Sequence, residues 1–391
     1  RRTSANAANI NFGQTPFVYN PPEGFQALCT SNIEDEPIID PKQHFDILTW
    51  TGNGSASHAI TGLKFKPDLV WIKCRSSAKW HILVDSIRGN SKNISSNSSN
   101  GEFTETHIPS FDNNGITVAD IDSGTANENS FTYVAWCWKA GGTAVSNTDG
   151  DITSQVSVNQ EAGFSIATYT GSTASGALTV GHGLGKKPAM VIIKRRDSTG
   201  EWSVGHQGLA VNAFANNKFL KVDSSNGVFT NSLVWGAEPT TTVTQIVTNG
   251  AGGAANLTSS GTYVMYSWAE IPGYSKFGHY TGNGSSDGTF INCGFKPSFV
   301  LAKRTDSTGY WRLLDSKRDP DNPAHHVLFP NTSDAVSDTD GSDQYNTDFL
   351  ANGFKIRTTL ASSNAAGGTW IFMAFADQTS LNQYNLAVNA R

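Results

Sequence analysis

The pentapeptide Thr-Gly-Asn-Gly-Ser occurs twice in this chain of 391 residues, at positions 51–55 and 281–285. The match continues without a gap to residue 88 at the same offset, and it places Arg88 against Arg318. An ungapped match of this length indicates a duplicated structural unit, because tracts of biased composition do not keep apolar and charged residues in register. The chain therefore has to fold as repeated units.

A third, more divergent copy lies between the two, at residues 168–202, where Tyr169-Thr170-Gly171 corresponds to Trp50-Thr51-Gly52 and Lys194 to Lys73. Asn-Gly pairs recur in the second half of each copy, at 111–118, 223–230 and 350–357. Every copy closes with an aromatic run: "FTYVAWCWKAGG", "GTYVMYSWAEIPG" or "GTWIFMAFADQ". The repeats predict an N-terminal segment at 1–42, domains at 43–142, 163–273 and 274–378, a linker or exposed strand at 143–162, and a tail at 379–391.

The residue pattern within each repeat predicts β-strands. "FDILTWTG" alternates apolar and polar residues, and the glycines of "GNGS" suit the turn that follows. Apolar runs that begin at a proline, such as "PDLVWIK", and the closing "YVAWCW" predict strands covered on both faces. Residues 209–221 have partial helical periodicity, which fits either a helix or a loop with one helical turn. The expected fold is all-β, with three tandem β-sandwich domains of the jelly-roll or lectin-like type.

Charge and hydropathy argue against two classes of function. Only 16% of the residues are charged, the net charge is −5, and no cluster of Lys and Arg offers a face for phosphates. No apolar stretch approaches the roughly 20 residues of a membrane-spanning helix. We therefore expect neither nucleic-acid binding nor membrane insertion. Cys74 and Cys137 lie within apolar runs, which predicts buried, reduced thiols rather than zinc ligands.

Residues 9–30, "NINFGQTPFVYNPPEGFQALCT", resemble the last strand of a SPRY-type domain. The three repeats, with "TGNG", "VGHGLG", "GYSKFG" and "ANGFKIR", resemble the repeat domains that follow SPRY segments in tail-fibre-like proteins of marine and cyanobacterial phages. The resemblance implies a SPRY-like terminal strand within residues 1–42. It also implies a virion structural and adhesion protein that is folded in the host cytoplasm and assembled, as a homotrimer with other virion proteins, into a tail fibre or other exposed appendage.

We expect this protein to bind a host-surface glycan or protein, without enzymatic activity and without a cofactor. Ser55 lacks the surroundings of a nucleophile elbow. Asp85 and Asp315 occupy equivalent positions, but the second repeat has His206 nearby, so the copies share no carboxylate. Three other roles fit the same features. They are a capsid decoration or spacer protein without receptor binding, a bacterial lectin-like surface protein, and a polysaccharide depolymerase whose paired acids meet only in space.

The candidate glycan or receptor-binding residues follow polar loops. They are Trp80, His81, Trp202, Tyr310 and Trp311. Exposed aromatic rings at a loop edge can stack on sugar faces while polar neighbours bind the hydroxyl groups. The same residues can instead begin the next strand and point inward. The aromatic residues within the repeated apolar runs are expected in the core: Trp50, Trp71, Tyr133, Trp136, Trp138, Trp268 and Trp370.

Two segments have residue types found in metal sites. His325-His326 is one, and the acidic segment 337–348 is the other. The acidic segment has carboxylates at alternate positions but lacks the closing Glu of a calcium-binding loop, so we interpret it as a solvated loop. The sequence therefore assigns no metal site.

Overall fold

The three repeats build three sheets with the same strand order. A computed structural model of the protein describes residues 38, 40–121, 124–172, 174, 176–232, 234–247, 261–336 and 345–377, all within a unit that spans 38–391. The first sheet consists of β1 (Phe45–Thr51), β9 (Thr132–Trp138), β3 (Leu69–Cys74) and β4 (Ile82–Asp85), in that order. The same order recurs in β12 (Phe164–Thr170), β19 (Thr262–Trp268), β14 (Met190–Arg195) and β15 (Trp202–His206), and again in β20 (Ser275–Thr281), β26 (Thr369–Ala376), β22 (Pro297–Arg304) and β23 (Arg312–Asp315).

A smaller sheet covers one face of each main sheet. In the first repeat it contains β2 (His58–Thr61), β8 (Gly115–Val118) and β7 (Ser110–Asp112); in the second, β13 (Ala177–Gly181) and β18 (Val243–Val247); in the third, β21 (Phe290–Asn292), β25 (Gly353–Ile356) and β24 (Thr347–Leu350). Helices in the described residues are single turns: η2 (Pro41–Gln43), η3 (Gln207–Leu209) and α1 (Ala361–Asn364). The predicted all-β, sandwich-like fold is confirmed.

Each main sheet is apolar on both faces because it serves two cores. One face packs inside its own sandwich, as in the first repeat, where Val70, Ile72 and Ala135 are buried together. The other face joins a cluster to which all three repeats contribute, with Trp138 in contact with Trp268 at 6.2 Å and with Phe299 at 5.9 Å between ring centroids. The seven tryptophan and tyrosine residues expected in the core are all buried, in this shared cluster or inside a single sandwich, and Cys74 and Cys137 are buried thiols.

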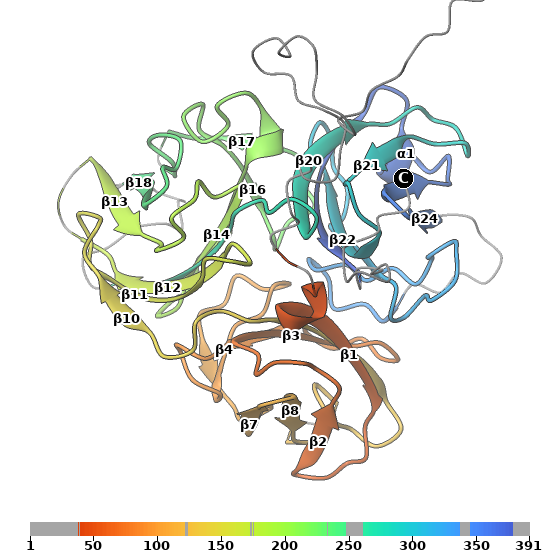
Figure 1. Ribbon diagram of the computed structural model, residues 1–391, viewed down its shortest axis with the longest axis horizontal. Coiled ribbons are helices and arrows are strands. Elements are labelled where there is room, and N and C mark those ends of the chain that lie inside the picture. Colours follow the sequence, from red (N-terminus) through yellow and green to blue (C-terminus); the bar gives the residue numbers. More distant parts are fainter. Residues whose placement is uncertain are drawn as a thin grey trace, which may run out of the picture. The chain divides into compact units, whose positions relative to one another are not determined.

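Equivalent hydrogen bonds join the repeats into a closed ring. The Lys194 ammonium of the second repeat donates to the Ser99 carbonyl of the first at 2.9 Å. Lys303 of the third repeat donates to the Ser225 carbonyl of the second at 3.2 Å. Lys73 of the first repeat donates to the Ser333 carbonyl of the third at 3.0 Å, which closes the ring. Figure 1 shows the three sandwiches around this common centre.

The repeated pentapeptide is a structural clasp. Gly54 and Gly284 have φ angles of 68° and 71°, which favour glycine. Each loop is held by a fully buried asparagine: the Asn127 side chain binds the Asn53 side chain at 2.9 Å and the Ser55 carbonyl at 2.9 Å. Asn364 makes the corresponding bonds in the third repeat. The motif therefore recurs in the first and third repeats because the same buried asparagine holds the loop in both.

The segment 143–162 belongs to the second repeat. It contains β10 (Val145–Asn147) and β11 (Ser154–Asn159), and β11 pairs antiparallel with β12 to extend the second sheet. The linker predicted at 143–162 is therefore replaced by two strands: β10 is mostly exposed, whereas β11 is largely buried and fills the edge of β12 rather than spacing two domains. The SPRY-like strand predicted within 1–42 and the tail at 379–391 lie outside the described residues, apart from residues 38 and 40–42.

Candidate functional site

The five predicted site residues divide into two groups. Trp80 and Tyr310 are each 46% exposed, as a binding role requires. His81, Trp202 and Trp311 are at most 1% exposed, so their rings cannot stack on a ligand. For these three the inward-pointing alternative is correct.

The three buried rings occupy the same position in the three repeats and bind the neighbouring repeat. Trp202 Nε1 donates to the Ser95 carbonyl at 3.0 Å, and Trp311 Nε1 donates to the Lys221 carbonyl at 2.9 Å. His81 accepts a bond from Trp71 at Nδ1, so its Nε2–H donates to the Phe329 carbonyl at 3.1 Å. Burial lowers the pKa of His81, which keeps the ring neutral. These residues hold the ring of repeats together.

Trp80 lines a pocket of about 530 Å³ in the first repeat, which we call the Trp80 pocket. Its indole meets the Phe103 ring edge to face, with centroids 6.4 Å apart and planes at 74°. Phe103 begins β6 (Phe103–Thr104), which pairs with β5 (Lys92–Asn93). The short hairpin-like pair therefore holds the second ring beside the exposed one.

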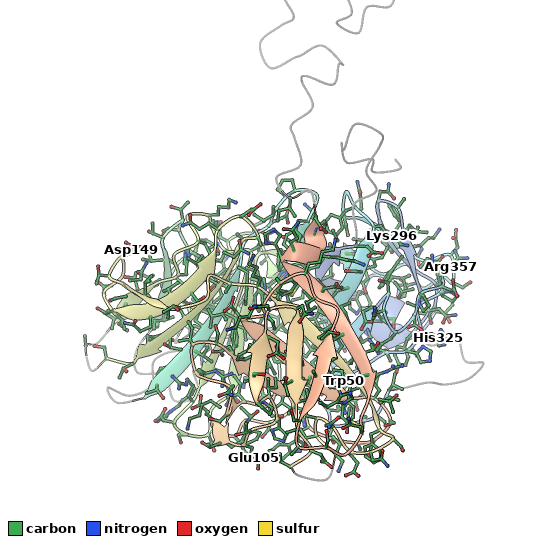
Figure 2. All side chains as sticks on the ribbon, turned by 60° about the horizontal axis from the view of Figure 1, so that its bottom comes forward. Trp50, Glu105, Asp149, Lys296, His325 and Arg357 are labelled. Atoms are coloured by element: carbon green, nitrogen blue, oxygen red, sulfur yellow. The ribbon has the colours of Figure 1, made fainter. Side chains whose placement is uncertain are left out.

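Polar groups surround the two rings. Glu105 and His107 face each other with Oε2 and Nε2 3.4 Å apart, and Glu105 is exposed while His107 is buried. Lys79, Asn100 and Thr125 complete the polar part of the lining. Figure 2 shows Glu105 at the outer edge of the first repeat, where solvent reaches it. A carboxylate, an amide and an ammonium group next to an exposed indole can bind the hydroxyl groups of a sugar whose apolar face lies on the ring.

The other repeats fill this position differently. Glu201 stands where the first repeat has Trp80, and it forms an ion pair with Lys221, whose ammonium lies 4.3 Å from the Phe229 ring centre. Tyr310 occupies the position in the third repeat and packs on Phe329 at 5.1 Å. The exposed indole therefore belongs to the first repeat.

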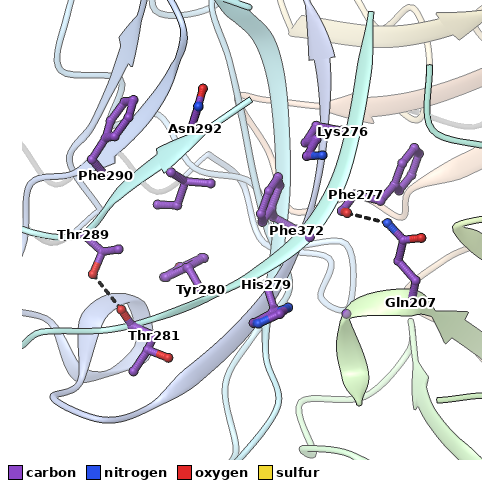
Figure 3. A pocket seen from close by; sticks show the side chains of 13 residues that line it. Gln207, Lys276, Phe277, His279, Tyr280, Thr281, Thr289, Phe290, Asn292 and Phe372 are labelled. Carbon is purple, nitrogen blue, oxygen red and sulfur yellow. Dashed lines mark hydrogen bonds between the residues drawn. The ribbon is translucent and has the colours of Figure 1, made fainter. Parts of the chain in front are cut away.

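A second hollow, of about 740 Å³, lies between β20 and β21 of the third repeat, and we call it the β20–β21 groove. Figure 3 shows Phe290 and Asn292 at one side, Tyr280 and Phe372 at its floor, and His279 on the strand β20. β20 is an edge strand whose Phe277 backbone is capped by Gln207 at 2.8 Å and by Glu270 at 3.1 Å. Phe290 is 43% exposed.

The buried lysines that join one repeat to the next have a structural role rather than a reactive one. Burial lowers the pKa of Lys73 and Lys194 to about 8 and that of Lys303 to about 7, and all three side chains are inaccessible. Their acceptors were missed by the sequence analysis, although "SSNG" occurs at both 98–101 and 224–227 and marks two of the three acceptor loops.

His325 and His326 lie together with Asp319 at the outer side of the third repeat. The acidic segment proposed as a solvated loop is described only from residue 345 onward, so 337–344 lie outside the described residues. None of the helices in the described ranges has the length and hydropathy needed to cross a membrane.

Comparison with known proteins gives a family without an assigned role. Searches against curated proteins and against solved structures gave no match. The family described as "Domain of unknown function (DUF7483)" matches residues 40–379, which include all three repeats. The chain belongs to the DUF7483 family.

Proposed function

We propose that this protein is a non-enzymatic adhesion protein that binds a host-surface glycan through the Trp80 pocket. The observation that supports the proposal is the exposed indole of Trp80 next to Phe103, with Glu105, Asn100 and Lys79 around it. Sites for sugars combine an apolar platform with a few fixed polar groups, and this pocket offers both.

The ring of three repeats gives the Trp80 pocket a rigid support, which suits a binding role. Lys73, Lys194 and Lys303 tie each repeat to the next, and the shared apolar cluster leaves no hinge between the described repeats. A rigid support reduces the entropic cost of binding because fewer groups have to be ordered. The resemblance to phage repeat proteins favours a tail fibre or other virion appendage as the location of the protein. Immunogold labelling of purified particles would show it at the tail periphery, whereas gold over the head would favour capsid decoration.

A glycan array on the purified chain, followed by calorimetry with the best ligand, tests the binding site. Trp80→Ala removes the platform, and burying one such ring is worth about 1.5–3 kcal/mol, so we expect the affinity to fall at least about tenfold. Phe290→Ala is the matched control, because Phe290 has nearly the same exposure but lies in the β20–β21 groove. We expect it to leave the affinity unchanged.

Two results would contradict the proposal. One is a glycan that binds equally well to the wild type and to Trp80→Ala. The other is a folded protein that binds no glycan on the array, which would favour the spacer role. Release of reducing ends from a bound polysaccharide would instead indicate a depolymerase.

A further inference from the structure

Three side chains with metal-ligating atoms converge in the loop that follows β23. They are Asp319, His325 and His326, and Figure 2 shows His325 at the outer side of the third repeat. One ligand atom from each residue lies within 4.8 Å of the other two. The cluster belongs to the third repeat and Trp80 to the first, and the two share no residue, so the cluster is independent of the proposed glycan site.

The carboxylate of Asp319 is oriented before any ligand arrives. Its Oδ2 accepts the backbone N–H groups of His325 at 3.1 Å and His326 at 2.9 Å. Its Oδ1 faces both imidazoles: it makes a short contact with Nδ1 of His326, and Nδ1 of His325 lies 3.8 Å away. The side chain of Asp319 is 3% exposed, whereas those of His326 and His325 are 23% and 43% exposed. An ion from solvent can therefore reach the two imidazoles, and the carboxylate of Asp319 lies behind them in a fixed orientation.

The first repeat shows that the fold does not need this cluster. Arg318 pairs with Asp315 at 2.7 Å, just as Arg88 pairs with Asp85, so the frame of the loop is common to both repeats. The isolated bridges Leu83–Ile94 and Leu313–Leu328 align the two loops. In that alignment Gly89, Ser91 and Lys92 stand where the third repeat has the three candidate ligands.

We propose that Asp319, His325 and His326 bind a divalent transition-metal ion of the zinc type, through Oδ1 and the two Nδ1 atoms, with water completing the coordination. Two imidazole nitrogens and one carboxylate oxygen are a donor set that Zn²⁺ accepts, with bonds of about 2.0–2.2 Å. Binding replaces the His326–Asp319 hydrogen bond and the 3.1 Å contact between His325 Nδ1 and the Pro323 carbonyl. Each neutral ring then carries its proton on Nε2. The guanidinium of Arg318 pairs with the Asp315 carboxylate. Arg75 also interacts electrostatically with Asp315 and Asp319.

Calorimetric titration of the chelator-treated full chain with Zn²⁺, and optical titration with Co²⁺, test this site. We expect one ion per chain, visible Co²⁺ absorption bands, and a higher melting temperature with Zn²⁺. His325→Ala keeps the Asp319–His326 pair intact and removes one ligand, so we expect the affinity to fall at least about tenfold. His279→Ala removes an exposed histidine of β20 in the same repeat and should change nothing.

The alternative is that Asp319 and His326 only fasten the loop. Absence of one-to-one binding in the wild type would establish it. An unchanged Zn²⁺ affinity in both His325→Ala and Asp319→Asn, with folding checked by circular dichroism, would equally overturn the proposal. Loss of binding in His279→Ala would place the ion elsewhere.

Discussion

Removing the buried asparagine of the clasp tests whether the repeated pentapeptide is structural. Asn127 makes four side-chain hydrogen bonds: with the backbone N–H of Asn53 at 3.3 Å, with the side chain of Asn53 at 2.9 Å, with the carbonyl of Ser55 at 2.9 Å and with Nδ1 of His58 at 2.9 Å. Each hydrogen bond contributes about 0.5–1.5 kcal/mol net, and buried groups left unpaired add to the loss. We therefore expect Asn127→Ala to lower the free energy of unfolding by about 2–5 kcal/mol.

The third repeat supplies the matched variant. Asn364 is also fully buried and binds Asn283, Ser285 and Thr358, so Asn364→Ala should cost a similar amount. Asn292→Ala is the control, because this exposed side chain caps only the nearby Gly294 N–H at 3.0 Å, and surface changes usually stay within about 0.5 kcal/mol.

Urea unfolding monitored by tryptophan fluorescence measures all three variants. Because one apolar cluster includes every repeat, we expect a single transition in each case. A loss below about 1 kcal/mol for both buried asparagines would refute the clasp, since the loop would then be held by its backbone alone. A separate early transition in Asn127→Ala would contradict the shared core instead.

Two further predictions concern the joints of the ring. Burial lowers the pKa of His206 to about 4, and its Nε2 binds the Phe372 carbonyl at 3.1 Å. The folded protein binds this proton less tightly than the unfolded chain, whose histidine pKa is about 6.5, so the free energy of unfolding decreases by up to about 3 kcal/mol as the pH falls from about 6.5 to 4. The urea midpoint of the wild type should therefore depend more steeply on pH over this range than that of His206→Gln. Equal pH dependences would exclude the effect. Trp202→Phe and Trp311→Phe keep the apolar ring but remove the donor between repeats, so each should cost about 1–3 kcal/mol, whereas a cost near zero would show that the carbonyls find other partners.

The repeat alignment predicted the strands well because apolar runs and turn glycines report on local structure. "PDLVWIK" and "YVAWCW" were expected to be covered on both faces, and β3 and β9 are buried almost throughout. The alignment could not show that the second cover is the other two repeats, since an apolar residue does not indicate what it packs against. The ring therefore had no signature of its own in the sequence.

The sequence could not predict whether each single aromatic side chain points to solvent or into the core. Trp80 and His81 are adjacent, and successive residues of an extended chain point to opposite sides, so one step in register exchanges the exposed ring for the buried one. Residues 223–230 were aligned with the turns at 111–118 and 350–357, but the structure makes them equivalent to 97–104, where Ser99 and Ser225 accept the lysines. Two similar Asn-Gly pairs within one repeat concealed the difference.

The division between shared and variable positions explains why the two proposed sites lie where they do. Positions that join repeats keep a residue able to donate: lysine at 73, 194 and 303, and a ring N–H at 81, 202 and 311. One residue before each ring the three repeats have tryptophan, glutamate and tyrosine, and these partly exposed side chains make a different contact in each repeat. Asp319 and Gly89 differ at a position next to the Asp–Arg pair that the first and third repeats share. The contacts between repeats are therefore alike around the ring, whereas the residues next to them differ and can give one repeat a binding property that the others lack.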